Sequence, residues 1–150
     1  MNNYTPNIDG VLITPINIIS VPGGDVLHGI KRNDAGYAGF GEAYFSTINT
    51  GVIKAWKRHR EMTMNLIVPT GSVRFVIYDD RASESSKHCF QQVILSRDKY
   101  FRLTVPPMVW MGFEGLGCED NMLLNISNTQ HSADELDRLM INEINFDWEK

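Results

Sequence analysis

Cysteine and histidine, the residues that form disulfides and bind transition metals, are scarce in this chain of 150 residues. Its two cysteines, Cys89 and Cys118, form no C-x-x-C pair, and none of its four histidines belongs to an H-x-H pair. Both cysteines lie beside apolar runs, which indicates free thiols in a reducing compartment. A catalytic metal usually needs about three protein ligands. We therefore predict that the protein holds neither a metal nor another cofactor.

Long apolar runs and an excess of positive charge are also missing. No apolar run approaches the roughly 20 residues that span a bilayer, and no basic segment followed by an apolar core begins the chain. Lysine and arginine number 14 against 18 aspartates and glutamates, for a formal net charge of -4. This balance argues against polyanion binding. We predict a cytoplasmic protein that binds neither membrane nor nucleic acid.

What the chain does have is a series of short apolar segments separated by turn signals. They are rich in β-branched and aromatic residues and lie about ten residues apart, which predicts strands rather than helices. A chain of this length fits one domain, residues 1–150, with its own core. The pattern predicts an all-β fold, either a closed barrel or a double-sheet jelly roll. The expected strands are residues 11–19, 26–30, 43–47, 52–56, 62–68, 73–78, 90–95, 101–105, 109–116 and 122–126.

One segment near the C-terminus has a helical pattern instead. Ser132 can cap a helix over residues 133–140, and Glu135 completes a capping box with it. We therefore predict a short C-terminal helix after the last barrel strand.

Basic residues gather where the strand over residues 52–60 ends. Strand alternation places Lys54, Trp56, Arg58 and Arg60 on one face, and Ala55, Lys57 and His59 on the other. The charge of Lys57 would lower the pKa of His59 and keep it neutral, as a general base requires. The alternative is a solvated strand end whose cations keep the sheet edge soluble.

Two aromatic residues follow a Pro-Pro turn. Trp110 and Phe113 could form an apolar wall against which a nucleobase or a sugar ring stacks. Packing of a β core is the alternative interpretation.

These segments resemble a known family: the cupin-fold enzymes that act on nucleotide-linked 4-keto-6-deoxy sugars. It comprises the dTDP-4-dehydrorhamnose 3,5-epimerase group and the sugar 3,4-ketoisomerases. The resemblance covers residues 25–148 and implies a cupin jelly-roll barrel that forms a homodimer, with N-terminal strands (residues 11–19) exchanged between subunits. It rests on residues 40–47 (FGEAYFST), 51–60 (GVIKAWKRHR), 62–65 (MTMN), 78–81 (YDDR), 105–107 (VPP) and 110–113 (WMGF), and on Gly71.

The chain departs from this family at the residues that carry the chemistry. In the epimerases the general base is a histidine at the position of Lys57, and the general acid is a tyrosine at or near Leu124 or Asn125. The ketoisomerases have an H-x-H pair whose second histidine matches His59. The resemblance therefore implies that His59 is the base and that Lys57 stabilises the enolate oxygen.

The resemblance implies a metal-independent epimerase that acts at C3, C5 or both of a nucleotide-linked 4-keto-6-deoxyhexose. The pathway would be the synthesis of surface polysaccharide, such as lipopolysaccharide O-antigen. A sugar 3,4-ketoisomerase and a catalytically silent sugar-nucleotide-binding cupin are the alternatives. The residues expected to bind the substrate are Lys54, Arg58, Arg60 and Arg74 at the diphosphate, Trp110 at the base or sugar, and Asn125.

Overall fold

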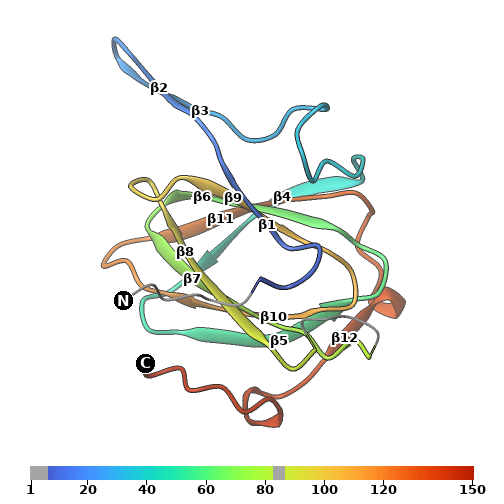
Figure 1. Ribbon diagram of the computed structural model, residues 1–150. Helices are drawn as coiled ribbons and strands as arrows, with labels where there is room; N and C mark the ends of the chain where they lie inside the picture. Colours follow the sequence, from blue (N-terminus) through green and yellow to red (C-terminus); the bar gives the residue numbers. More distant parts are fainter. Residues whose placement is uncertain (1–6, 83–86) are drawn as a thin grey trace.

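The computed structural model describes residues 7–82 and 87–150. Two antiparallel sheets face each other and form a jelly-roll barrel (Figure 1). The predicted all-β fold is confirmed. The first sheet has the order β1 (Leu12–Pro15), β9 (Phe101–Val105), β6 (Met64–Thr70), β11 (Asn121–Ser127) and β4 (Glu42–Ile48). The second has the order β12 (Leu136–Arg138), β5 (Ile53–His59), β10 (Trp110–Gly115), β7 (Ser72–Tyr78) and β8 (Phe90–Ser96).

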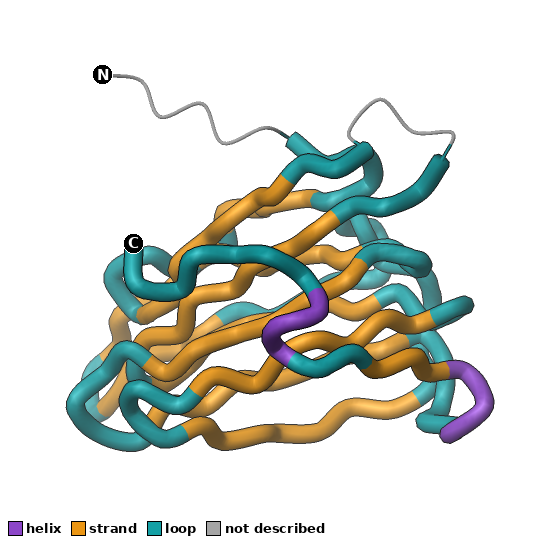
Figure 2. Tube along the Cα trace, turned by 90° about the horizontal axis from the view of Figure 1, so that it is seen from below, coloured by secondary structure: helices purple, strands orange, loops and turns teal. Residues whose placement is uncertain are grey.

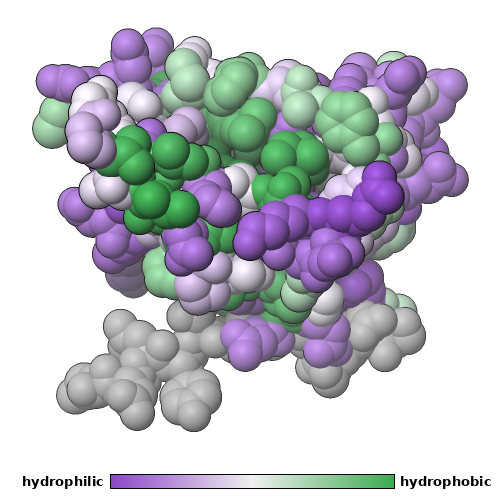
Figure 3. Space-filling model, turned by 90° about the horizontal axis from the view of Figure 1, so that it is seen from above, coloured by the Kyte–Doolittle hydropathy of each residue, from purple (hydrophilic) through white to green (hydrophobic). Residues whose placement is uncertain are grey.

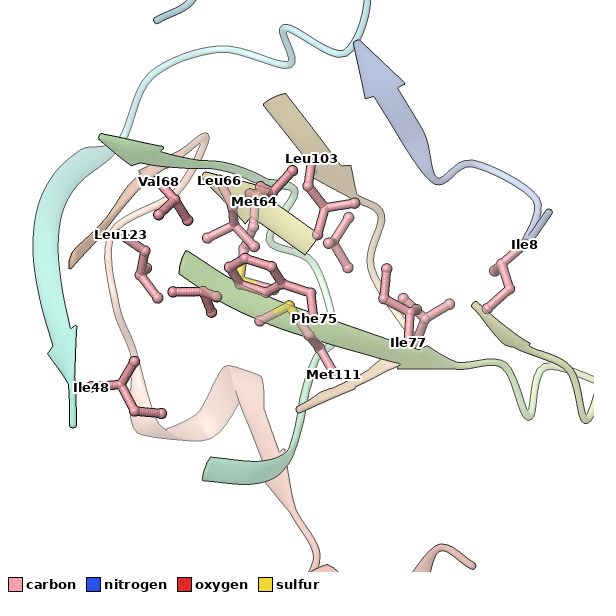
Figure 4. Packing of buried hydrophobic residues seen from close by; sticks show 14 of the residues in the cluster. Ile8, Ile48, Met64, Leu66, Val68, Phe75, Ile77, Leu103, Met111 and Leu123 are labelled. Atoms are coloured by element: carbon pink, nitrogen blue, oxygen red, sulfur yellow. The ribbon is translucent and has the colours of Figure 1, made fainter. Parts of the chain in front are cut away.

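The main core lies between the two sheets. Inward side chains of the first sheet, such as Leu66 and Leu103, meet those of the second, such as Phe75 and Met111 (Figure 4). Each such side chain contributes about 1.5 to 3 kcal/mol by leaving water. This apolar filling fixes which face of every strand points inward, because a slip by one residue would turn the set outward.

The turn between β6 and β7 requires glycine. Gly71 has a φ of +79°, and a Cβ there would lie 2.5 Å from Oδ1 of Asn121. The same Asn121 oxygen accepts hydrogen bonds from the amides of Ser72 and Gly117. Gly71 therefore allows the chain to reverse tightly against β11.

A two-stranded hairpin, β2 (Ile18–Val21) and β3 (Gly24–Leu27), projects from the barrel (Figure 1). The single strand expected over residues 11–19 is thus two strands, of which β1 pairs with β9 of the same chain. Ile19, Val21 and Val26 are 45 to 49% exposed. Viewed from above, the molecule shows apolar areas among polar ones (Figure 3). The homodimer with exchanged strands stays a prediction.

The predicted C-terminal helix over residues 133–140 is wrong. The chain there forms a 3-10 turn (η1, Ala133–Glu135), the strand β12, and a second 3-10 turn (η2, Ile141–Glu143) (Figure 2). Ser132 makes no side-chain cap, and the Glu135 carboxylate accepts hydrogen bonds from β5 and the loop after it instead. Pairing of Leu136–Arg138 with β5 therefore replaces the helix that the local pattern favours.

The last residues cross the outer face of the second sheet (Figure 2). Ile144, Phe146 and Trp148 pack against Trp56 and Trp110 in a second apolar cluster. This segment holds β12 and η2 beside the open edge of the barrel, where the cavity described next lies.

Candidate functional site

A cavity of about 640 Å³ lies between the two sheets at one edge of the barrel. On one side is β4, the edge strand of the first sheet, and on the other are β5 of the second sheet and the C-terminal segment. The cavity volume is in the range typical of small-molecule sites. Strands β4, β5 and β10 supply its walls, and the chain after β12 covers one side. The lining residues are Ser46, Lys54, Ala55, Trp56, Lys57, Met111, Phe113, Arg138, Leu139, Met140 and Glu143.

A bulge in β5 brings two lysines to the cavity. Lys57 pairs with Met111 and Lys54 pairs with Phe113, so two residues of β5 stand opposite the single residue Gly112. The prediction that Lys54 faces away from Lys57 is therefore wrong, because simple alternation fails at the bulge. Gly112 leaves room for this, since a Cβ there would lie 2.7 Å from that of Ala55.

The cavity favours an anion. Lys54, Lys57 and Arg138 line it, with Glu143 as an acid among the described lining residues. Burial lowers the pKa of Lys57, and the charges of Arg138 and Lys54 lower it further, while Glu135 opposes them. A negatively charged ligand would relieve this repulsion among the cations. Arg138 was not predicted as a site residue, because it lies within the segment, residues 133–140, that was expected to be a helix.

His59 is buried two residues beyond Lys57 on the same side of β5, with 3% of its surface exposed. It is not among the residues that line the cavity. Its Nδ1 lies 2.7 Å from Oε2 of Glu135, and its Nε2 is buried with no hydrogen-bond partner among the described residues. Burial lowers the pKa of His59, the hydrogen bond with Glu135 raises it, and the charge of Lys57 lowers it. The predicted effect of Lys57 is confirmed in direction, although burial is the larger cause.

The Glu135 carboxylate fixes the tautomer of His59. Burial raises the pKa of Glu135, but the hydrogen bonds from His59 and from the amides of Glu61 and Met62 bring it below its ordinary value. An ionised carboxylate only accepts hydrogen bonds, so the proton of the neutral imidazole is on Nδ1. Nε2 therefore carries the lone pair that a general base needs. Sequence reasoning missed Glu135 because its spacing from Ser132 matched a capping box.

Five other predicted ligands do not line this cavity, and four of them are on the outer face of the second sheet. Arg58 pairs with Asp137 at 2.8 Å and stacks on Trp110, whose Nε1 donates to Asp80. Arg60 also pairs with Asp137, at 2.6 Å. These side chains lie on the outer face of the second sheet, where Trp110 lines a separate hollow of about 430 Å³.

Arg74 is also on the outer face. It pairs with Glu114 at 2.5 Å and donates to the main-chain carbonyls of Trp148 and Lys150. Its contacts hold the C-terminal segment against the sheet.

Asn125 points into the barrel from β11 and is 1% exposed. Its Nδ2 donates to the hydroxyl of Tyr44 at 3.0 Å, and its Oδ1 is buried without a partner among the described residues. Tyr44 stands directly opposite it on β4, two residues before the cavity-lining Ser46.

The described residues contain neither a membrane-spanning helix nor a metal cluster. No helix there is long and apolar enough to cross a membrane. Within the same residues, no group of three or more histidine, cysteine, aspartate or glutamate side chains is placed to hold a metal ion.

No family model matches the chain. Among solved structures, a dTDP sugar isomerase from Desulfovibrio desulfuricans G20 is 34% identical, with a TM-score of 0.90 over 95% of this chain and 92% of that one. The chain belongs to the family of dTDP-sugar isomerases and related epimerases. The resemblance seen in the motifs is thus confirmed.

A more distant solved structure shares the fold, and two other proteins match in sequence. The 3,5-epimerase from Legionella pneumophila Philadelphia 1, solved with dTDP-4-keto-L-rhamnose, has a TM-score of 0.80 at 17% identity and covers 91% of this chain and 76% of that one. The spore coat polysaccharide biosynthesis protein SpsL of Bacillus subtilis is 26% identical over 94% of this chain and 96% of its own. The probable low-salt glycan biosynthesis epimerase Agl13 of Haloferax volcanii is 26% identical over 63% of this chain, a match that spans 62% of its own length.

Glu135→Gln tests the anchoring of His59. We expect the substitution to reduce the free energy of unfolding at neutral pH by about 1 to 3 kcal/mol, since buried donors lose an ionised acceptor. The pKa of Glu135 is below its ordinary value of 4.5, so its ionised carboxylate stabilises the fold at pH values above 4.5. This stabilisation is lost as the pH falls below that value. The wild type should therefore lose stability more steeply than the variant below that pH.

Urea unfolding at several pH values measures both effects. Glu149→Gln, at an exposed carboxylate in the same C-terminal segment, is the matched control and should change little. Equal stability of Glu135→Gln and wild type at neutral pH would show that the carboxylate does not anchor this site.

Proposed function

We propose that this protein is a metal-independent epimerase of a nucleotide-linked 4-keto-6-deoxyhexose, acting at C3, C5 or both. The observation that carries the proposal is the buried, unpartnered Nε2 of His59, whose ring is held through Nδ1 by Glu135 and lies two residues along β5 from the cavity-lining Lys57. Membership of a family whose solved members include a dTDP sugar isomerase supports it.

The chemistry needs a base next to the ketone and a positive group at its oxygen. In the proposed reaction Nε2 of His59 takes the proton from the carbon beside the carbonyl, and the electrons of that bond move to the carbonyl oxygen. The ammonium form of Lys57 stabilises the resulting enolate. Return of a proton to the opposite face of the same carbon gives the epimer.

The diphosphate of the substrate is assigned to the cations at the cavity. Lys54 and Arg138 both line it, and Arg138 offers the bidentate geometry that suits a phosphate. Arg58, Arg60 and Arg74 are ion-paired on the outer face, so we place them outside the substrate site.

A role in glycan synthesis follows from the relatives. SpsL is named for spore coat polysaccharide biosynthesis and Agl13 for low-salt glycan biosynthesis. We propose that this protein supplies a sugar nucleotide to a surface polysaccharide, and that it acts in the cytoplasm as a homodimer.

A sugar 3,4-ketoisomerase is the second candidate. His59 matches the second histidine of the ketoisomerase pair, and the relative from Desulfovibrio desulfuricans is described as an isomerase. The two reactions share the first proton transfer and differ in where the proton returns.

Solvent exchange tests the proposed function. In deuterated water, with dTDP-4-keto-6-deoxyglucose as the probe, we expect deuterium to enter at C3, C5 or both, and a new epimer to appear by NMR. Entry of deuterium at C4, with migration of the ketone to C3, would select the ketoisomerase. Binding of the nucleotide sugar with no exchange at any carbon would indicate the silent binder and refute the proposal.

His59→Asn tests the base. Loss of a general base lowers rates by about 100-fold to 10,000-fold, so we expect exchange to fall by that factor while binding of dTDP is retained. His88→Asn, at an exposed histidine outside the cavity, is the matched control and should exchange at the wild-type rate. An unchanged rate in His59→Asn would remove this residue from the mechanism.

A further inference from the structure

The proposed reaction needs a proton donor, and the position at which its relatives carry a tyrosine holds Leu124 or Asn125 here. Leu124 alternates with the inward Leu123 and Asn125 and therefore faces away from the core. Asn125 faces inward, but an amide cannot give up a proton to carbon. The donor must come from another residue.

We propose that Tyr44 is the catalytic acid, and that it reaches the site from the strand beside β11. This inference rests on the proposed function, since it names the group that completes the same reaction. The phenol of Tyr44 and the amide of Asn125 are directly opposite each other in the β4 and β11 pair. A tyrosine one strand away can thus present its hydroxyl beside the inward position of Asn125.

The direction of the hydrogen bond suits an acid. Asn125 Nδ2 donates to the phenol oxygen at 3.0 Å, so the hydroxyl hydrogen of Tyr44 is free to point elsewhere. When that hydrogen leaves, a phenolate remains, and a donated hydrogen bond stabilises the charged form. Asn125 is therefore a positioning residue that holds the phenol and supports it after proton transfer.

Unpartnered polar atoms mark the surroundings of Tyr44 as a ligand site. Oδ1 of Asn125 is buried without a hydrogen-bond partner among the described residues, and so is Oε1 of Glu42, two residues before Tyr44 on the same face of β4. Buried polar atoms in proteins are nearly always paired. One of these atoms is on β11 and the other on β4, the strand that lines the cavity through Ser46, and together they indicate a polar substrate that supplies their partners.

Base and acid then come from different sheets. His59 is on β5 of the second sheet and Tyr44 is on β4 of the first, with the cavity between these two edge regions. In the inverting step the O–H bond of Tyr44 breaks and a C–H bond forms on the face of the enolate away from His59. The electron pair of the enolate makes that bond, and solvent later restores the proton to the phenolate.

Tyr44→Phe separates proton removal from inversion. His59 can still remove the proton and return a deuteron to the same face, so we expect deuterium exchange within about threefold of wild type. Formation of the epimer should fall about 100-fold or more, because that is the usual cost of losing a general acid. Both rates come from one NMR experiment with dTDP-4-keto-6-deoxyglucose in deuterated water.

Asn125→Ala and Tyr100→Phe complete the test. Asn125→Ala keeps the phenol of Tyr44 and removes the amide that donates a hydrogen bond to it. We therefore expect the rate of inversion to fall about tenfold while the rate of deuterium exchange is retained. This variant tests the role of Tyr44 if Tyr44→Phe does not fold. Tyr100 donates its hydroxyl hydrogen to the carbonyl of His28, away from the cavity, and Tyr100→Phe should leave both rates unchanged.

Three results would overturn the inference. Inversion at the wild-type rate in folded Tyr44→Phe would exclude Tyr44 as the acid. Equal loss of exchange and inversion, with dTDP binding retained, would show that Tyr44 does not act in the second proton transfer. Absence of exchange in the wild-type protein would refute the proposed function itself, and the inference with it.

Discussion

The carboxylate of Glu135 is the contact on which the site depends. It accepts hydrogen bonds from the His59 ring and from the amides of Glu61 and Met62, and so ties the C-terminal segment to the end of β5. From this point β12 pairs along β5 and carries Arg138 to the cavity. The same carboxylate thus sets the tautomer of the imidazole and fixes the start of the segment that covers the cavity.

In the proposed mechanism the chain keeps the acid and base chemistry of its relatives, but the acid and the base each come from a different position in the barrel. The base lies two residues along β5 from the position of Lys57, on the same side of the strand. The acid lies one strand across from the position of Asn125, on β4. Both displacements preserve the inward direction of the side chain, because i and i+2 share a face and paired residues on neighbouring strands do too. The barrel can therefore retain its reaction while the residues that perform it change.

Most of the strands could be predicted, since apolar alternation over short segments depends on local sequence and on burial alone. Three features could not. The bulge that turns Lys54 toward the cavity arises from pairing with β10, opposite Gly112. The helix expected after Ser132 gives way to β12 because Glu135 has partners on another strand. Arg74 is held in an ion pair by Glu114, a residue 40 positions away, which occupies the guanidinium that was expected to bind the diphosphate. Each of these depends on contacts between distant segments, which no local pattern records.

The most direct test of this account is the protonation state of the His59 ring, measured by nitrogen-15 NMR at neutral pH on the protein without ligand. The account predicts a neutral imidazole with its proton on Nδ1 and a bare Nε2. A ring protonated on both nitrogens, or a neutral ring with its proton on Nε2, would contradict it.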